Sequence, residues 1–341
     1  MAIDRAAMLP LMHAAIVGIA GPTLLDEEAA LFRRHPPAGV ILFARNIHDP
    51  PQLGALIASL RRVLPRNLVV MVDQEGGRVA RLRPPHWRAH PPAAAIGRLF
   101  VSNRGAGLRA AFLTGALIGL DCRAAGFDVA AAPVLDLGIA GASNVIGDRA
   151  FAADPIAVAR LGRALAAGLL AAGIQPVGKH APGHGRALVD SHLALPRVHA
   201  GDLRADLLPF ALNIHLPWLM TAHIVYAAWD PLQPATVSPA VIKGIIRGRL
   251  GFGGIVTSDD LAMQALTGTP AQRAAAALAA GCDIALYCAG ELDPTAELLA
   301  KAPRLSPDAV ARLDAARALA ALRRLPLDPR ALAAEQERLL A

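Results

Sequence analysis

Cysteine is scarce in this chain: the 341 residues contain three, Cys122, Cys282 and Cys288. Their spacing shows no Cys-x-x-Cys pair and no zinc-knuckle pattern, so no thiolate metal cluster is predicted. An odd, sparse set of cysteines also argues against a disulfide framework and favours a reducing compartment. We therefore expect a cytoplasmic protein without structural disulfides.

Nucleotide-binding motifs are also missing. No Gly-x-Gly-x-x-Gly run opens a helix after a strand, and no P-loop sequence is present, so neither function is indicated. The net charge is +7, but the basic residues are mostly arginines spread along the chain without a block of five or six. This pattern favours a solvated basic surface, or an anionic small substrate, over nucleic-acid binding.

The N-terminal sequence gives only weak evidence for a membrane-targeting segment. Between Ala6 and Leu25 the only titratable side chain is His13, which resembles a weak signal peptide. However, Pro10 and His13 interrupt the run, and no positive cluster precedes it. Residues 14–21 also suit a first strand, which cleavage would remove. We expect no transmembrane span and no membrane partner.

Apolar residues, in contrast, are abundant at 54%, and charged residues make up 18%, which allows a large core. Eight short apolar runs recur between alanine-rich helical stretches. Continuous apolar runs suit strands buried on both faces, and strands that alternate with helices form a parallel sheet. We predict an α/β fold, namely a single-domain (β/α)8 TIM-like barrel over residues 1–341 with a helical tail from about 305 to 341. The runs are residues 14–21, 39–46, 68–73, 128–136, 174–180, 218–223, 254–259 and 283–288.

Polar residues gather at the predicted C-terminal ends of these strands, where barrel enzymes carry their active sites. Such a set suits a polyol pocket, in which charged side chains hydrogen-bond several hydroxyls. For Asp73 and Arg81, an ion pair that ties down a loop is a compatible second interpretation. The residues at the strand ends are Arg45, Asn46, Asp73, Glu75, Arg78, Arg81, Asp136, Asn144, Asp148, Arg149, Lys179, His180, His223, Ser258, Asp259 and Asp260.

The segment from Lys179 to His192 is the densest in titratable groups, with a lysine, three histidines and an aspartate. Asp190 lies two residues before His192, so in a turn its carboxylate can fix the tautomer of the imidazole and raise its pKa toward neutrality. A glycosidase needs one group at the anomeric carbon and another that protonates the leaving oxygen. Asp259 suits the first role, and His192 held by Asp190 suits the second.

Two neighbouring carboxylates are given other roles. Asp260 is expected to point away from the site and to cap a helix that starts at Leu261. Glu75 is the one glutamate at a strand end that offers an alternative acid. His192 is preferred, because its unperturbed pKa already lies near the operating pH.

Together these segments resemble glycoside hydrolase family 3, in particular its single-domain bacterial β-N-acetylhexosaminidases of cell-wall recycling. The resemblance runs from about Ile16 to Tyr287. Each marker alone is weak, whereas all six in this order are specific. The markers are GVILFARN at 39–46, VDQEGGRV at 72–79, APVLD at 132–136, VIGDR at 145–149, the segment 179–192 and SDDL at 258–261.

The resemblance implies a retaining mechanism through a covalent glycosyl-enzyme. In it, Asp259 is the nucleophile and His192 the general acid/base, with Asp190 as its partner. It implies a terminal N-acetylglucosamine β-1,4-linked to a 1,6-anhydro-N-acetylmuramic acid peptide as substrate, and no metal or organic cofactor. We expect the protein to act on this small carbohydrate as a monomer. The residues that match sugar-binding positions of the family are Asp73, Arg81, Arg149, Lys179 and His180.

One residue departs from the family pattern: Ala181 stands where an aromatic is usual. The change removes packing beneath the loop but touches no group with a chemical role. A variant of the hypothesis is phosphorolysis, because a histidine acid/base leaves less negative charge to repel an incoming phosphate.

Two alternatives from other classes stay open. A metal-dependent barrel hydrolase would use ligands among the histidines and Asp259, although the arginines at the strand ends would repel a cation. A non-catalytic sugar-binding protein would bind without turnover, because fold alone does not determine function. The candidate metal ligands are His180, His184, His192, His223 and Asp259.

Overall fold

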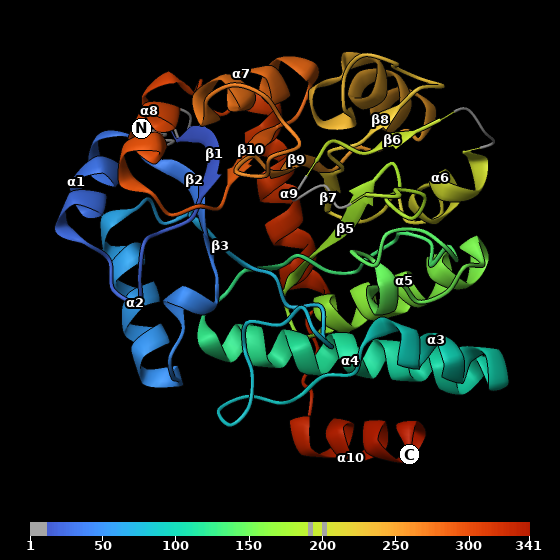
Figure 1. Cartoon of the computed structure of the whole chain (residues 1–341). Coiled ribbons are helices and arrows are strands. Elements are labelled where there is room, and N and C mark those ends of the chain that lie inside the picture. Colours follow the sequence, from blue (N-terminus) through green and yellow to red (C-terminus); the bar gives the residue numbers. More distant parts are fainter. Residues whose placement is uncertain (1–11, 190–193, 200–202) are drawn as a thin grey trace, which may run out of the picture.

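The computed structural model describes residues 12–189, 194–199 and 203–341. Eight parallel strands form a closed barrel in the order β1-β10-β9-β7-β5-β4-β3-β2, and helices surround it (Figure 1). The (β/α)8 barrel predicted from the sequence is confirmed, and each predicted apolar run overlaps one barrel strand. The strands are β1 (His13–Val17), β2 (Pro37–Leu42), β3 (Val69–Val72), β4 (Val129–Ala130), β5 (Gln175–Ala181), β7 (Trp218–Thr221), β9 (Ile255–Asp260) and β10 (Ile284–Tyr287).

The barrel strands are buried on both faces, because one face fills the barrel interior and the other packs under the helices. Trp218 is the largest fully buried side chain, and its indole Nε1 donates a hydrogen bond to Gln175 Oε1 at 2.9 Å. Its one polar atom is therefore satisfied inside an otherwise apolar cluster. That cluster includes Ile16, Ile41, Met71, Val129, Val177, Met220, Ile255 and Ile284.

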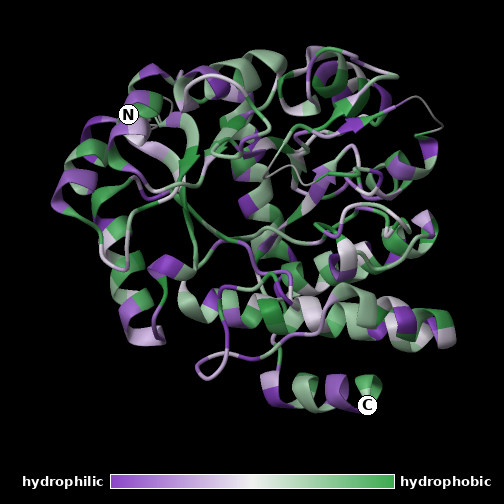
Figure 2. Cartoon of the chain, in the orientation of Figure 1, coloured by the Kyte–Doolittle hydropathy of each residue, from purple (hydrophilic) through white to green (hydrophobic). Residues whose placement is uncertain are grey.

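Six of the described helices begin where the sequence supplies a capping side chain. Before five of them the cap residue is followed directly by proline, and its side chain accepts a hydrogen bond from a first-turn N–H. Polar and apolar residues alternate along the helices, which cover the barrel with one face (Figure 2). The helices are α1 (Asp26–Arg34), α2 (Pro50–Val63), α3 (Ala93–Ser102), α4 (Arg104–Ala125), α5 (Pro155–Ala171), α6 (Arg204–Ala211), η5 (Ala240–Arg249), α7 (Pro270–Ala280), α8 (Leu292–Lys301), α9 (Pro307–Arg323) and α10 (Pro329–Leu340); the short η2 (Ala44–Asn46), η3 (Gly147–Arg149) and η4 (Ala235–Val237) are 3-10 turns.

The predicted helical tail consists of α9 and α10. The last helix, α10, lies against α4 at the edge of the molecule (Figure 1). Glu335 accepts two hydrogen bonds from Arg109, at 2.7 and 2.6 Å, and Gln336 Nε2 donates to Thr114 Oγ1 at 2.6 Å. Within the described residues, α4 alone is long and apolar enough to cross a membrane, but 67% of its most apolar window is buried inside the protein.

Two local features differ from the prediction. The prediction that a helix starts at Leu261 is wrong, because residues 261–266 form turns and the next helix starts at Pro270. Asp260 Oδ1 accepts hydrogen bonds from the backbone N of Ala262 at 2.9 Å and of Cys288 at 3.0 Å, which holds this segment against the barrel. A small parallel pair, β6 (Arg197–Val198) and β8 (Val225–Tyr226), was also not predicted.

Candidate active site

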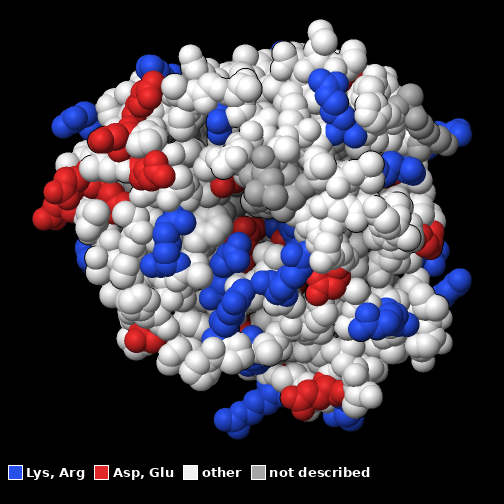
Figure 3. Space-filling model, in the orientation of Figure 1, with Lys and Arg blue, Asp and Glu red and all other residues white. Residues whose placement is uncertain are grey.

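A cavity of about 510 Å³ opens at the C-terminal ends of the barrel strands. Acidic and basic side chains gather at this hollow in the space-filling view (Figure 3). The structure thus brings together six of the eight residues predicted from the sequence. Asp190 and His192 lie outside the described residues. The six that line the cavity are Asp73, Arg81, Arg149, Lys179, His180 and Asp259.

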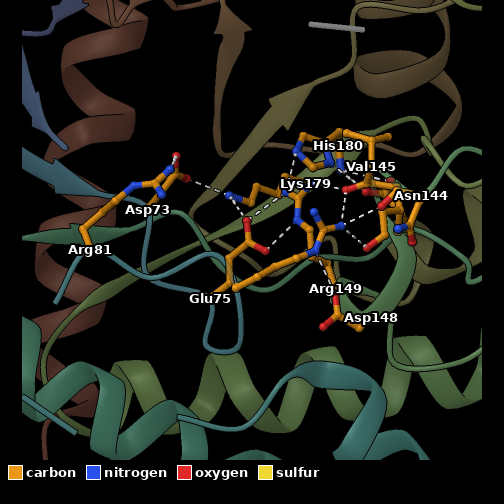
Figure 4. Close-up of polar contacts among 12 residues, drawn as sticks. Asp73, Glu75, Arg81, Asn144, Val145, Asp148, Arg149, Lys179 and His180 are labelled. Atoms are coloured by element: carbon orange, nitrogen blue, oxygen red, sulfur yellow. Dashed lines mark hydrogen bonds and ion pairs between the residues drawn. The ribbon is translucent and has the colours of Figure 1, made fainter. Parts of the chain in front are cut away.

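Lys179 is the centre of the charged side of the cavity. It lies on β5 with its side chain 2% exposed, and its Nζ is 2.8 Å from Asp73 Oδ1 and 2.6 Å from Glu75 Oε1 (Figure 4). Burial disfavours the ammonium ion, but the two carboxylates outweigh burial and raise the pKa of Lys179. The lysine is therefore a fixed cation that holds both carboxylates ionised.

Glu75 joins this lysine to Arg149. The Arg149 guanidinium donates two hydrogen bonds to Glu75, from Nε and from Nη2, both at 2.9 Å. Burial would raise the pKa of Glu75, but Lys179 and Arg149 lower it to about 2. Glu75 is consequently ionised at neutral pH and cannot serve as the proton donor that the sequence left open. The sequence placed Glu75 at a strand end and offered it as an alternative acid, but its role as the shared partner of Lys179 and Arg149 was not predicted.

The loop after β3 is pinned so that Arg81 returns to the cavity. Gln74 Oε1 accepts hydrogen bonds from the backbone N of Arg81 at 2.7 Å and of Leu82 at 3.0 Å. Gly76 and Gly77 adopt positive φ angles, 96° and 56°, which side chains rarely allow. Arg81 Nη2 then lies 3.4 Å from Asp73 Oδ2. This long ion pair fits both the loop-anchoring and the sugar-binding interpretations.

His180 is oriented by Asp136, a carboxylate that is fully buried six residues after β4. Asp136 Oδ2 lies 2.6 Å from His180 Nδ1, and Oδ1 accepts hydrogen bonds from the backbone N of His180 at 3.1 Å and of His184 at 2.7 Å. Burial would raise the pKa of Asp136, but His180 outweighs it and lowers the pKa. His180 Nε2 therefore faces the cavity, 3.4 Å from Arg149 Nη2. The sequence placed Asp136 at a strand end without a role.

Asp259 lies at the end of β9, opposite the charged residues. Its Oδ1 accepts a hydrogen bond from the backbone N of Asp260 at 2.8 Å. Burial would raise the pKa of Asp259, but His180, the backbone N–H of Asp260 and Lys179 oppose it and the pKa is lowered, so the carboxylate is ionised at neutral pH. Within the described part of the chain Asp259 forms no ion pair. An ionised, unpaired carboxylate has the reactivity that a nucleophile requires.

The described residues contain no group of three or more His, Cys, Asp or Glu side chains placed to hold a metal ion. His180 is engaged with Asp136, and His223 Nε2 lies 2.9 Å from the carbonyl oxygen of Asp260. The metal-dependent alternative gains no support from these residues. Ala181, the departure from the family pattern, is fully buried at the end of β5, and its carbonyl accepts a hydrogen bond from Ala222 N at 2.8 Å.

The closed barrel, with carboxylates and cations at one rim around an open cavity, is the arrangement of a barrel enzyme whose active site lies at the strand ends. Residues 13–318 match the glycosyl hydrolase family 3 N-terminal domain, and the chain belongs to that family.

Curated relatives show which type of glycosyl hydrolase this chain is similar to. A β-hexosaminidase of Aromatoleum aromaticum is 40% identical over 310 residues, which cover 89% of this chain and 86% of that protein. A β-hexosaminidase of Bordetella pertussis is 42% identical over 284 residues, covering 81% and 80%. The chain is therefore a glycoside hydrolase of the β-hexosaminidase type, as the sequence predicted.

Solved structures agree with this assignment. NagZ of Neisseria gonorrhoeae in complex with zinc ion superimposes with a TM-score of 0.85 at 32% identity, covering 98% of this chain and all of that chain. The same protein in complex with N-trifluoroacetyl-D-glucosamine gives a TM-score of 0.78 at 33% identity, covering 93% and 100%.

Proposed function

We propose that the protein is a retaining exo-β-N-acetylglucosaminidase of peptidoglycan recycling. Its substrate is a fragment in which a non-reducing N-acetylglucosamine is β-1,4-linked to a 1,6-anhydro-N-acetylmuramic acid that carries a peptide. The observation that carries the proposal is the ionised Asp259 at the end of β9, which faces a cavity lined with sugar-binding groups. The N-acylglucosamine bound by the gonococcal relative supports the same sugar.

The charged side of the cavity suits the hydroxyls of one terminal sugar. Asp73 accepts hydrogen bonds, Arg149 and Lys179 donate them, and His180 presents Nε2. Because these groups already hold one another in place, little ordering remains when a sugar binds. Apolar side chains of Ile41, Phe43, Met220, Met263 and Leu286 line the rest of the cavity and suit the C–H faces of a sugar ring.

In the proposed reaction Asp259 attacks the anomeric carbon while the bond to the leaving oxygen breaks. The acid/base donates a proton to that oxygen, and the glycosyl-enzyme forms. The acid/base then takes a proton from water, which attacks the anomeric carbon and releases Asp259. We assign the acid/base to His192 with Asp190 from the sequence, since both lie outside the described residues.

The cellular setting belongs to the proposal as well. The three cysteines are buried and unpaired, which supports a reducing cytoplasm. We propose a cytoplasmic monomer whose partner is the soluble carbohydrate, without nucleic acid or membrane.

The test compares an aryl β-N-acetylglucosaminide with an aryl β-glucoside, each with and without phosphate, for the native chain and Asp259→Ala. We expect preferential cleavage of the acetamido substrate, loss of turnover on the order of 10⁴-fold in the variant, and no requirement for phosphate. Asp308→Ala, which changes an exposed carboxylate in the first turn of α9 outside the cavity lining, is the matched control and should retain activity.

Phosphate-dependent turnover would instead assign a phosphorylase. A native chain that cleaves neither substrate would contradict the glycosidase assignment.

A further inference from the structure

Three buried side chains hold the peptide segment that carries Asp259. They are Thr221 at the end of β7, His223 just beyond it, and Thr236 in η4, and all three are fully buried. The backbone N of Asp259 donates a hydrogen bond to Thr221 Oγ1 at 3.3 Å, and His223 Nε2 lies 2.9 Å from the carbonyl oxygen of Asp260. Both ends of the Asp259–Asp260 dipeptide are therefore held from the neighbouring strand.

Thr236 connects the two contacts. Its Oγ1 lies 2.7 Å from Thr221 Oγ1 and 2.8 Å from His223 Nδ1. Starting at the Asp259 N–H, the contacts run through Thr221, Thr236 and His223 and return at the Asp260 carbonyl. The three side chains and the dipeptide form a closed ring of hydrogen bonds.

The chemistry of the groups determines where each proton lies. The Asp260 carbonyl can only accept, so His223 Nε2 must carry a proton. Burial lowers the pKa of His223, so the ring is neutral and Nδ1 is a bare acceptor. Thr236 Oγ1 lies 2.8 Å from Nδ1 and, farther away, 3.1 Å from the carbonyl oxygen of Ala222. Its single proton goes to the nearer Nδ1, which would otherwise face a lone pair of the hydroxyl, and Thr221 donates to Thr236. Thr221 finally accepts from the Asp259 N–H, so each donor in the ring has one acceptor.

We infer that Thr221, Thr236 and His223 are positioning residues whose one-directional hydrogen-bond ring fixes the Asp259 carboxylate for attack. The inference rests on the proposed role of Asp259 as the nucleophile. The ring acts on the carboxylate through the peptide bond it encloses, because the Asp260 N–H donates to Asp259 Oδ1 at 2.8 Å. A rotation of this peptide would move that hydrogen bond and turn the carboxylate with it.

The ring also explains how Asp259 can be held without losing reactivity. A lysine or arginine in direct contact would orient the carboxylate but would also stabilise its negative charge before attack. The ring is neutral, so it supplies orientation alone. Misplacement of a reacting group by about 1 Å can reduce a rate by 10²-fold. A ring that prevents such misplacement can therefore outweigh the cost of burying its polar side chains.

The decisive variant is Thr236→Val, which has nearly the same shape but lacks the hydroxyl that joins Thr221 to His223. We expect kcat for an aryl β-N-acetylglucosaminide to fall about 10- to 100-fold. KM should change less than threefold, because the sugar-binding side chains lie on the other side of the cavity. Thr236→Ser, the matched control, keeps the hydroxyl and should retain kcat within about threefold. Both are measured well below their melting temperatures.

A spectroscopic readout tests the proton positions independently of activity. Long-range ¹H–¹⁵N correlation spectra of the native protein should show His223 neutral with its proton on Nε2. In Thr236→Val the Nδ1 signal should shift, because Nδ1 loses its donor. Should Thr236→Val fail to fold, Thr221→Val replaces it: it keeps the shape but removes the hydroxyl that joins Thr236 to the Asp259 N–H, and the same fall in kcat is expected.

The outcomes separate the two proposals. An active native enzyme with unchanged kcat in Thr236→Val, or with the His223 proton on Nδ1, would overturn the ring. A fall in kcat that Thr236→Ser does not prevent would also overturn it, because packing rather than the hydroxyl would then be responsible. A native enzyme that cleaves no glycoside would overturn the proposed function, and the ring would lose its catalytic role.

Discussion

The two sides of the cavity hold their carboxylates in opposite ways. On the side of β3 and β5, Asp73 and Glu75 are paired directly with buried cations. On the side of β7 and β9, Asp259 is held by hydrogen bonds to neutral groups and, within the described residues, by no ion pair. Ion pairs fix the carboxylates of Asp73 and Glu75, whose proposed role is confined to binding. Hydrogen bonds to neutral groups leave the charge of the Asp259 carboxylate available for the proposed reaction.

The comparison also has an energetic side. A buried ion pair costs desolvation of both partners, and removal of one partner leaves an uncompensated charge. A neutral hydrogen-bond ring costs less to bury, and each lost contact is worth about 1 kcal/mol. The charged side should therefore be the more sensitive to single substitutions, and the following predictions test that difference.

Lys179→Met should have the largest effect on stability. It leaves Asp73 and Glu75 buried without their shared cation, so we expect a loss of about 3–5 kcal/mol in the free energy of unfolding. Urea unfolding measures it. Adding Glu75→Gln to this variant should restore part of the loss. No recovery in the double variant would show that the lysine acts through packing.

Asp136→Asn tests the carboxylate behind His180. The amide oxygen can still accept from the backbone N–H groups, so the fold should survive, but the negative charge beside Nδ1 is lost. We expect kcat/KM for the aryl β-N-acetylglucosaminide to fall about 10- to 100-fold, the range seen when a partner that orients a histidine is removed. Unchanged kcat/KM would show that His180 needs no charged partner.

The two sides should respond to acid in different pH ranges. The pKa of Glu75 is about 2 in the folded protein against 4.5 for a free glutamate, so its stabilisation is present above pH 4.5 and is lost as the pH falls toward 2. Its size is roughly 3 kcal/mol. The stability difference between the native protein and Glu75→Gln should therefore shrink across this range.

On the neutral side the loss starts at higher pH. The folded-state pKa of His223 lies below the free value of 6.5, so the unfolded chain takes up a proton first and stability falls as the pH drops below 6.5. His223→Gln should remove this part of the acid response and leave the Glu75 range unchanged. Urea unfolding between pH 7 and pH 3 measures both. Identical pH profiles for the native protein and His223→Gln would contradict a neutral His223.

The smallest expected effect is that of a chelator. Neither side of the cavity relies on a metal in the proposed reaction, so activity on the aryl substrate should be unchanged by excess EDTA. Loss of activity that added Zn²⁺ or Mn²⁺ restores would revive the metal-dependent alternative.

Much of this architecture was predictable because it is encoded locally. Strands buried on both faces read as continuous apolar runs, and a cap residue followed by proline marks five helix starts. Strands β6 and β8, which pair with each other, have two residues each and are too short to show any periodicity in the sequence. Leu261 was assigned to a helix because Asp260 resembles a cap, whereas its carboxylate bonds to the backbone of Cys288, 28 residues away.

The candidate site also contains residues that the sequence could predict and residues whose roles it could not. Asp73, Lys179, His180 and Asp259 lie within or directly after barrel strands, so the barrel alone brings them to one rim. Arg81 and Arg149 reach the same rim from the longer loops after β3 and β4. Glu75 and Asp136 gain their roles from partners 74 and 44 residues away, and no local pattern reports such contacts. His223 was considered as a strand-end residue and as a metal ligand but not as a positioning residue, since its two hydrogen bonds depend on Thr236 and Asp260 in the folded chain.

The contact between α10 and α4 has a consequence for the timing of folding. Leu332 of α10 packs on Leu113, Ala116 and Leu117 of the long apolar α4. About 200 residues separate the two helices, and a ribosome adds about 5–20 residues per second. This face of α4 therefore waits roughly 10–40 s for its cover while the chain is made. During that interval the growing polypeptide exposes one apolar face of α4, and such a transiently exposed surface is prone to aggregation until α10 covers it.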